Sequence, residues 1–218
     1  MLSTHSPLLL ACILFLCFVA DESFAFSASA KPASSIFDSI SSFFGGNNQS
    51  SLQNQNEAKR QELKSKLLQV CKADTVARNE VESIIDELKT LQSFQETASS
   101  PLLRKEWLLV WTTEKEINFF SDFNISADIS QTITSDGVLT NMIPFQKGGS
   151  FGVVGKVEAD ENIPQRTNFV FESAKLDLGQ FQFTLPPVGQ GWFDTLYLDE
   201  ELRVDLNSRN DILICTPL

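Results

Sequence analysis

The chain has 218 residues, of which 42% are hydrophobic and 21% charged, and its formal net charge at pH 7 is −11. This acidic balance argues against a nucleic-acid partner, because binding a phosphate backbone requires clustered Lys and Arg. The length left after removal of an N-terminal targeting segment suits one domain with a proper hydrophobic core.

The first 25 residues have the pattern of a signal peptide. Residues 8–20 form an apolar run that is too short to span a bilayer comfortably, and Ser23-Phe24-Ala25 provides the small residues that a signal peptidase prefers. We therefore expect cleavage after Ala25. A short membrane anchor is the alternative interpretation.

Residues 26–56 have the composition of an organelle transit peptide. They contain nine serines and a single acidic residue, Asp38. A signal peptide followed by such a segment resembles the bipartite presequence of algae whose plastids derive from a red alga. The pattern predicts a plastid protein, and the alternative is a secreted protein with a Ser-rich linker.

Residues 57–100 are expected to be helical. The first part carries Leu63, Leu67, Leu68 and Val70 along one side. The second part has a clear stripe at three- and four-residue spacing, formed by Val81, Ile84, Ile85, Leu88 and Leu91. We expect the stripe to pack on the protein's own sheet, and a partner-binding helix is the alternative.

From Lys105 onward the hydrophobic period changes to two, which predicts strands through residues 101–218. Trp107, Leu109 and Trp111 would share one strand face, and a further strand is expected from Ile117 to Ile125. Turn sequences such as Asp136-Gly137 and Gly148-Gly149 separate the later runs. About eight or nine short strands, each apolar on one face, indicate an antiparallel β-barrel, and the fold is mainly β with an N-terminal helical section.

The predicted strands have a strong aromatic bias, with 18 Phe and three Trp in the chain. An eight-stranded barrel is just wide enough to be filled by side chains or to hold one small ligand. A remaining cavity would be apolar, and its candidate lining residues are Trp107, Trp111, Phe119, Phe169, Phe171, Phe181 and Phe183. A solid core is the alternative.

Catalysis is tested by elimination. The only histidine is His5, within the expected signal peptide, so the mature chain lacks Ser-His-Asp and Cys-His devices and imidazole metal ligands. No phosphate-binding glycine loop is present. We therefore expect no enzyme, no cofactor and no metal, while the state of the two remaining cysteines, Cys71 and Cys215, stays open between free thiols and a disulfide.

The last thirty residues carry the most specific pattern in the chain. They contain Gly191-Trp192, Tyr197-Leu198-Asp199, Leu202-Arg203-Val204 and Arg209-Asn210-Asp211. This series resembles the C-terminal signature of the plastid lipid-associated protein (PAP)/fibrillin family, with Asn210 in place of a turn glycine. Because Asn is the residue that best replaces Gly in the left-handed conformation, we expect the hairpin to be retained.

The resemblance implies a lipocalin-like barrel associated with plastoglobules or thylakoids. It implies a pair in which Arg203 packs over Trp107 to close the barrel, a structural role. The implied function is non-catalytic binding or sequestration of an apolar plastid lipid, such as a carotenoid, a quinone or an acyl lipid. The alternative is a scaffold that coats lipid droplets or associates with a thylakoid membrane complex. Ligand identity and oligomeric state stay open.

Overall fold

A computed structural model describes residues 46–73, 76–115, 117–118, 128–186 and 189–218. The expected signal peptide (1–25), most of the Ser-rich segment and the pocket candidate Phe119 lie outside the described residues.

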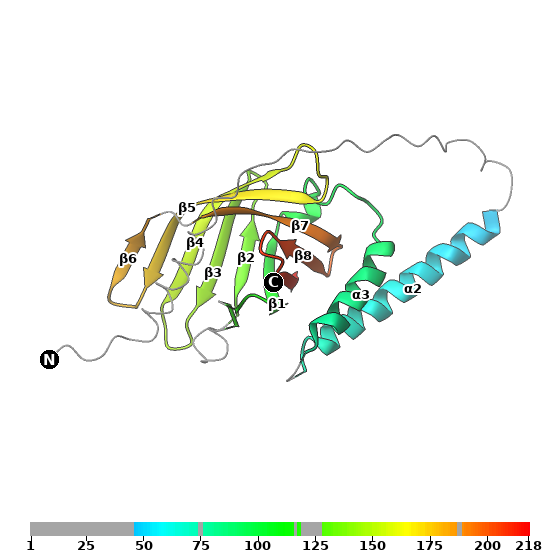
Figure 1. The fold of residues 1–218 in the computed structure, drawn as a ribbon, viewed down its shortest axis with the longest axis horizontal. Coiled ribbons are helices and arrows are strands. Elements are labelled where there is room, and N and C mark those ends of the chain that lie inside the picture. The colour runs from blue at the N-terminus through cyan, green and yellow to red at the C-terminus, as the bar shows by residue number, and fades with distance from the viewer. Residues whose placement is uncertain (1–45, 74–75, 116, 119–127, 187–188) are drawn as a thin grey trace.

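The core of the molecule is one nine-stranded antiparallel sheet that curls into a ring (Figure 1). The strand order is β4-β3-β2-β1-β9-β8-β7-β5-β6, and an additional pairing of β4 with β5 closes the ring. The strands are β1 (Glu106–Thr112), β2 (Ser130–Ile133), β3 (Val138–Pro144), β4 (Ser150–Ala159), β5 (Arg166–Asp177), β6 (Gln182–Leu185), β7 (Gln190–Leu198), β8 (Arg203–Asn207) and β9 (Ile212–Pro217).

Strand β5 closes the ring because it is long enough to pair with three neighbours. One edge pairs with β4 along the strand, whereas the other edge pairs with β7 through residues 166–170 and with β6 through residues 174–177. Eight strands therefore form the ring, and β6 extends from it. The expectation of a mainly β, antiparallel barrel-like fold preceded by helices is confirmed.

Two helices pack against the outer face of the ring. Helix α2 (Gly46–Val70) lies beside α3 (Arg78–Thr90), and a short 3-10 turn, Pro101–Leu103, leads into β1. In α3 the residues Val81, Ile84, Ile85 and Leu88 are buried, and they cluster with apolar residues of β7, β8 and β9. The apolar stripe is therefore used within the molecule, as the sequence predicted.

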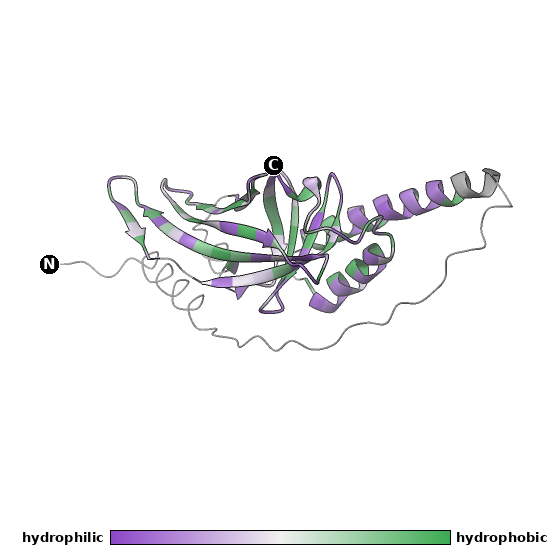
Figure 2. Ribbon diagram, turned by 90° about the horizontal axis from the view of Figure 1, so that it is seen from above, coloured by the Kyte–Doolittle hydropathy of each residue, from purple (hydrophilic) through white to green (hydrophobic). Residues whose placement is uncertain are grey.

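The outer end of α2 has a different character. Helix α2 begins at Gly46, so it crosses position 57, where the helical part was expected to begin. Its residues 52–59 are all exposed, and Figure 2 shows that hydrophilic residues dominate this part of the helix. Only the C-terminal half of α2, which contains the buried Leu63 and Leu67, contributes to the core.

A buried lysine fixes α2 to the turn between β7 and β8. Lys64 Nζ lies 2.8 Å from Asp199 Oδ2 and 2.5 Å from Glu201 Oε2, and the Tyr197 hydroxyl donates to Asp199 at 2.7 Å. Burial alone would raise the pKa of Asp199, but the Lys64 ammonium and the Tyr197 hydroxyl outweigh it and lower that pKa. The carboxylate thus stays charged and holds the helix.

The structure corrects the predicted face of Trp111. A β-bulge falls between Leu109 and Trp111, because Leu109 pairs with Cys215 while Trp111 pairs with the next residue along β9, Ile214. The extra residue, Val110, reverses the alternation. Trp111 therefore packs with the outer cluster beneath the helices rather than inside the ring.

The predicted strand from Ile117 is also wrong at its start. Lys115, Ile117 and Asn118 are helical, and the Asn118 amide donates to the Glu114 carbonyl at 3.0 Å, as in a helical turn. The Thr112 hydroxyl accepts a hydrogen bond from the Glu114 amide at 3.0 Å and so supports the start of this turn. The rest of that predicted strand lies in residues outside the described part.

The turn before β9 confirms the expected role of Asn210. Its φ is 64°, the only positive φ of a non-glycine residue in the described chain. The Asn207 side-chain oxygen accepts hydrogen bonds from the amides of Arg209 and Asp211, both at 2.9 Å. Asn210 therefore holds the left-handed position that a glycine would otherwise take.

We predict that Asn210→Gly leaves the free energy of unfolding within about 0.5 kcal/mol of the parent, because glycine adopts this conformation without steric cost. Asn210→Val should lose about 1–2 kcal/mol, because a β-branched residue is strained there. Urea unfolding of the two variants measures the difference. Equal stability of both variants would contradict this account of the turn.

Candidate ligand cavity inside the barrel

The strands β7, β8 and β9 are buried on both faces, and this gives the ring a distinct interior. In β8, Arg203 and Asp205 point away from the helices, whereas Val204 belongs to the outer cluster; in β9, Cys215 belongs to the inner cluster and Ile214 to the outer one. Alternation along each strand thus separates a helix-packing set from an interior set. The helices cover the outer face of these strands, and the inner face lines the interior of the ring.

The interior contains a cavity of about 160 Å³. Its apolar wall comes from six strands and from the segments that follow β1 and precede β2: Trp107, Leu109, Ile117, Ile129, Leu139, Ile143, Phe151, Val153, Phe169, Phe171, Phe193, Leu213 and Cys215. The rings of Phe169 and Phe171 lie 4.9 Å apart between centroids, and those of Phe169 and Phe193 lie 6.5 Å apart. The strand alternation therefore assembles an aromatic-walled site.

The cavity also has a polar region, centred on Arg203. The Arg203 side chain is 1% exposed; its Nε donates to Asp205 at 2.7 Å and its Nη2 to the Gln131 side-chain oxygen. Asp205 also accepts from the Thr195 hydroxyl at 2.8 Å. Gln131 in turn donates to Asn141 at 2.9 Å, so these buried and half-buried polar side chains form a connected network.

Arg203 lies over two aromatic rings. Its Cζ is 5.5 Å from the Trp107 ring centroid and 5.3 Å from the Phe193 centroid. The Trp107 indole donates to the Leu103 carbonyl at 3.1 Å, which fixes the plane of the indole at the start of β1. The expected contact between Arg203 and Trp107 is thus present, and it joins the last part of the sheet to the first.

The pKa values of Arg203 and of the neighbouring Cys215 are both shifted, for different reasons. Burial lowers the pKa of a cation and raises that of a thiol. It opposes the charge of Arg203, but the Asp205 carboxylate outweighs it, so the pKa of Arg203 is raised. Burial raises the pKa of the Cys215 thiol to about 12. Arg203 therefore stays a fixed cation, and Cys215 stays an uncharged wall residue.

The structure divides the predicted pocket residues into two groups. Trp107, Phe169 and Phe171 line the cavity, whereas Trp111 lies on the outer face. Phe181 and Phe183 are 64% and 46% exposed, because β6 extends beyond the closed ring. The expectation that Phe181 and Phe183 face inward is corrected by this placement.

Sequence reasoning missed several residues of the lining. Phe151 and Phe193 line the cavity, although neither is among the predicted pocket residues. Gln131, Asn141 and Asp205 carry no apolar pattern that would mark them as interior. Asp205 is fully buried, whereas Gln131 and Asn141 are half-buried, and only the closed ring shows that all three share the interior with Arg203.

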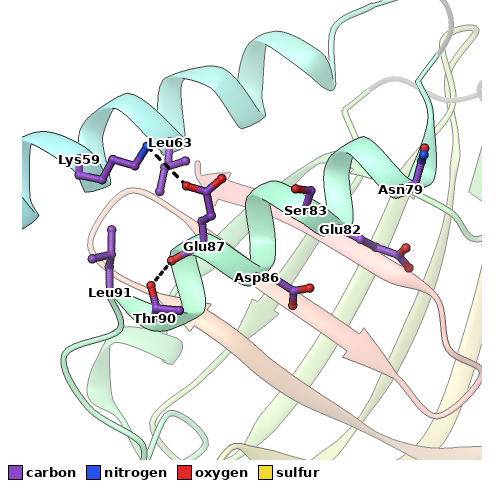
Figure 3. A pocket seen from close by; sticks show the side chains of 9 residues that line it. All are labelled: Lys59, Leu63, Asn79, Glu82, Ser83, Asp86, Glu87, Thr90 and Leu91. Carbon is purple, nitrogen blue, oxygen red and sulfur yellow. Dashed lines mark hydrogen bonds and ion pairs between the residues drawn. The ribbon is translucent and has the colours of Figure 1, made fainter.

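A larger hollow of about 640 Å³ lies on the surface between α2 and α3 (Figure 3). It is an open groove, and its rim carries Glu82, Asp86 and Glu87. Lys59 Nζ lies 3.4 Å from Glu87 Oε2 across the groove. Because this groove is polar and solvated, we assign the ligand site to the smaller, apolar interior cavity.

The described residues contain neither a metal-binding cluster nor a membrane-spanning helix. No group of three or more His, Cys, Asp or Glu in that part of the chain is placed to hold a metal ion. None of the helices described has the length and apolar content needed to cross a membrane.

Comparison with known proteins shows the family to which the chain is related. The PAP_fibrillin family model matches residues 61–185, more than half of the chain. The chain belongs to the PAP/fibrillin family. This match lies upstream of the C-terminal motifs that carried the resemblance, so it supports the assignment independently of them.

Two proteins of Arabidopsis thaliana are similar to this member of the family. The probable plastid-lipid-associated protein 11, chloroplastic, is 36% identical over 147 residues, which cover 65% of this chain and 68% of that protein. The probable plastid-lipid-associated protein 12, chloroplastic, is 30% identical over 151 residues. That match covers 61% of this chain but 36% of the length of its relative.

Both cysteines of the described chain are free and buried, and burial raises the pKa of Cys71 as well as that of Cys215 to about 12. We predict that iodoacetamide at pH 8 modifies neither residue in the folded protein, because the reactive thiolate is scarce and the sulfur is covered. Peptide mass mapping measures this site by site. Both residues should react in urea, and rapid labelling of Cys215 without denaturant would contradict the buried placement.

Proposed function

We propose that this protein binds or sequesters apolar plastid lipids without catalysis, at plastoglobules or thylakoids. The observation that carries the proposal is the aromatic-walled interior cavity in a member of a lipid-associated family. Carotenoids, quinones and acyl lipids are the candidate ligand classes. Each methylene buried in such a cavity contributes about 0.8 kcal/mol to binding, so burial of even part of a lipid's hydrocarbon chain favours the complex.

The size of the cavity limits how a lipid binds. About 160 Å³ is close to the volume of an engineered apolar cavity that holds one benzene, which is about 150 Å³. A whole carotenoid is much larger than this. We therefore propose that the ring takes one end of the lipid, and that the remainder stays at the barrel mouth or in the lipid phase.

The same proposal includes a plastid location. Both relatives are named as chloroplastic, and the N-terminal sequence has the composition of a bipartite presequence. We propose that residues 1–25 are a signal peptide, residues 26–56 a transit segment and residues 57–218 the family domain. A red-algal type of secondary plastid is the compartment that this arrangement fits, and secretion is the alternative.

We predict that Val153→Phe lowers lipid loading at least tenfold. Val153 is buried and lines the cavity, so the larger ring takes the space that the lipid end needs. The purified protein is incubated with a plastid lipid extract, re-isolated by size exclusion and analysed by mass spectrometry. Val170→Phe is the matched control, because the same change falls on an exposed side chain of β5. Equal loading of both variants would contradict the interior site.

A second candidate function is supported by one surface feature. The hairpin of β5 and β6 exposes Leu178, Phe181 and Phe183, and it lies at the end of the molecule opposite the helices (Figures 1 and 2). Exposed aromatic residues at one extremity suit contact with a lipid surface. The second candidate is therefore a scaffold that coats lipid droplets or associates with a thylakoid complex through this hairpin.

We predict for this second candidate that Phe181→Ser combined with Phe183→Ser lowers binding to phosphatidylcholine-coated oil droplets at least fivefold. The loss follows from removing two aromatic side chains from the contact area. Leu52→Ser, on the exposed end of α2, is the control and should bind like the parent. Droplet flotation measures the bound fraction. Unchanged flotation of the double variant would exclude the hairpin as the contact.

A further inference from the structure

We propose that the cavity selects a neutral apolar ligand that carries a carbonyl-type oxygen at its inner end, and that Nη1 of Arg203 donates a hydrogen bond to this oxygen. The inference rests on the proposed function and specifies the ligand class for the same site. It assigns Arg203 a binding role in addition to the structural contact with Trp107.

The first observation is an unused donor. Nε and Nη2 of Arg203 are engaged by Asp205 and Gln131, whereas the buried Nη1 has no hydrogen-bond partner among the described residues. An unmet buried donor costs free energy, and the cost is larger for a charged group. Arg203 lines the cavity, so an acceptor at this end of a ligand would remove that cost.

The second observation is that the guanidinium is held in place before any ligand binds. Asp205 is fully buried and binds two nitrogens of the guanidinium, while the rings of Trp107 and Phe193 pack against Cζ. A fixed planar fork loses little side-chain entropy when a further hydrogen bond forms. The position of Nη1 is therefore suited to recognition as well as to closure of the ring.

The charge balance of the lining selects a neutral ligand. Its four charged residues form two opposite pairs, Arg203 with Asp205 and Arg209 with Glu114, the latter at 3.0 Å. A carboxylate ligand would bring a fifth, unbalanced charge into an interior of low dielectric. A ketone, ester or similar carbonyl provides the acceptor without that charge.

The wall next to Arg203 selects the shape of the inner end. Phe193 contacts both the guanidinium and the ring of Phe169, so the donor and the aromatic wall are adjacent. A cavity of about 160 Å³ accommodates one ring or a short chain beside that wall. The inner end of the ligand is thus a compact apolar group that bears the oxygen.

Three small probes test the inference: acetophenone, ethylbenzene and benzoate. Acetophenone and ethylbenzene have nearly the same shape and differ in the carbonyl, whereas benzoate replaces the carbonyl with a carboxylate. Dissociation constants are measured by calorimetry on the purified protein and on the variant R203M/D205N. The double change removes the donor together with the charge of its partner, and the amide oxygen that it introduces at position 205 can still accept from the Thr195 hydroxyl.

We expect the ratio of acetophenone affinity to ethylbenzene affinity to fall about tenfold or more in the variant, as for the loss of a hydrogen bond to a charged donor. The infrared carbonyl stretch of acetophenone bound to the parent should lie below its frequency in hexane. A purely structural Arg203 would not move that frequency. Benzoate should bind more weakly than acetophenone.

Each negative result would overturn a different part of the proposal. An unshifted carbonyl frequency or an unchanged ratio, with ethylbenzene still bound, would overturn the role of Arg203 and leave the apolar site standing. Tighter binding of benzoate would overturn the selection of a neutral ligand. Binding of none of the probes would overturn the inference and the proposed function together. The infrared measurement uses the parent protein alone, so an unshifted frequency would overturn the role of Arg203 even where the variant does not fold.

Discussion

Closure of the sheet by β5 is the constraint on which the interior depends. β5 reaches β4 on one edge and β7 on the other, and the backbone comes very close at the bulge, where a Cβ on Gly155 would lie 2.2 Å from the Val170 carbonyl oxygen. Only glycine permits this approach. Without it the ring would open between β4 and β5, and Phe169, Phe171 and Phe193 would no longer enclose a cavity.

The two faces of β7, β8 and β9 then have different roles. The outer face packs on α2 and α3 and accounts for much of the core, whereas the inner face carries the Arg203 network and the aromatic wall. Because the apolar stripe of α3 is consumed by this packing, it does not provide a partner surface. The proposed lipid contacts are therefore the interior cavity and the exposed β5–β6 hairpin, which extends beyond the ring.

The sequence was sufficient for the fold class, the helix-to-strand change near Lys105, the α3 stripe and the Asn210 turn, since each depends on local periodicity or local backbone preference. It was insufficient where pairing between distant strands decides whether a side chain points into the ring or out of it. The bulge at Val110 turns Trp111 outward, and the extension of β6 beyond the ring exposes Phe181 and Phe183. The polar half of the cavity has no such pattern, because Gln131 meets Arg203 only across the closed ring, and nothing local shows that Arg203 and Asp205, two residues apart on β8, face the interior.

We propose that the closed ring holds the end of one apolar lipid. The most direct measurement is native extraction of the protein from its own source, followed by mass spectrometry of the lipid that accompanies it and determination of the molar ratio. We expect about one neutral, carbonyl-bearing apolar lipid per chain. A protein that is extracted without any lipid, or that carries a mixture of lipids in no fixed ratio, would contradict it.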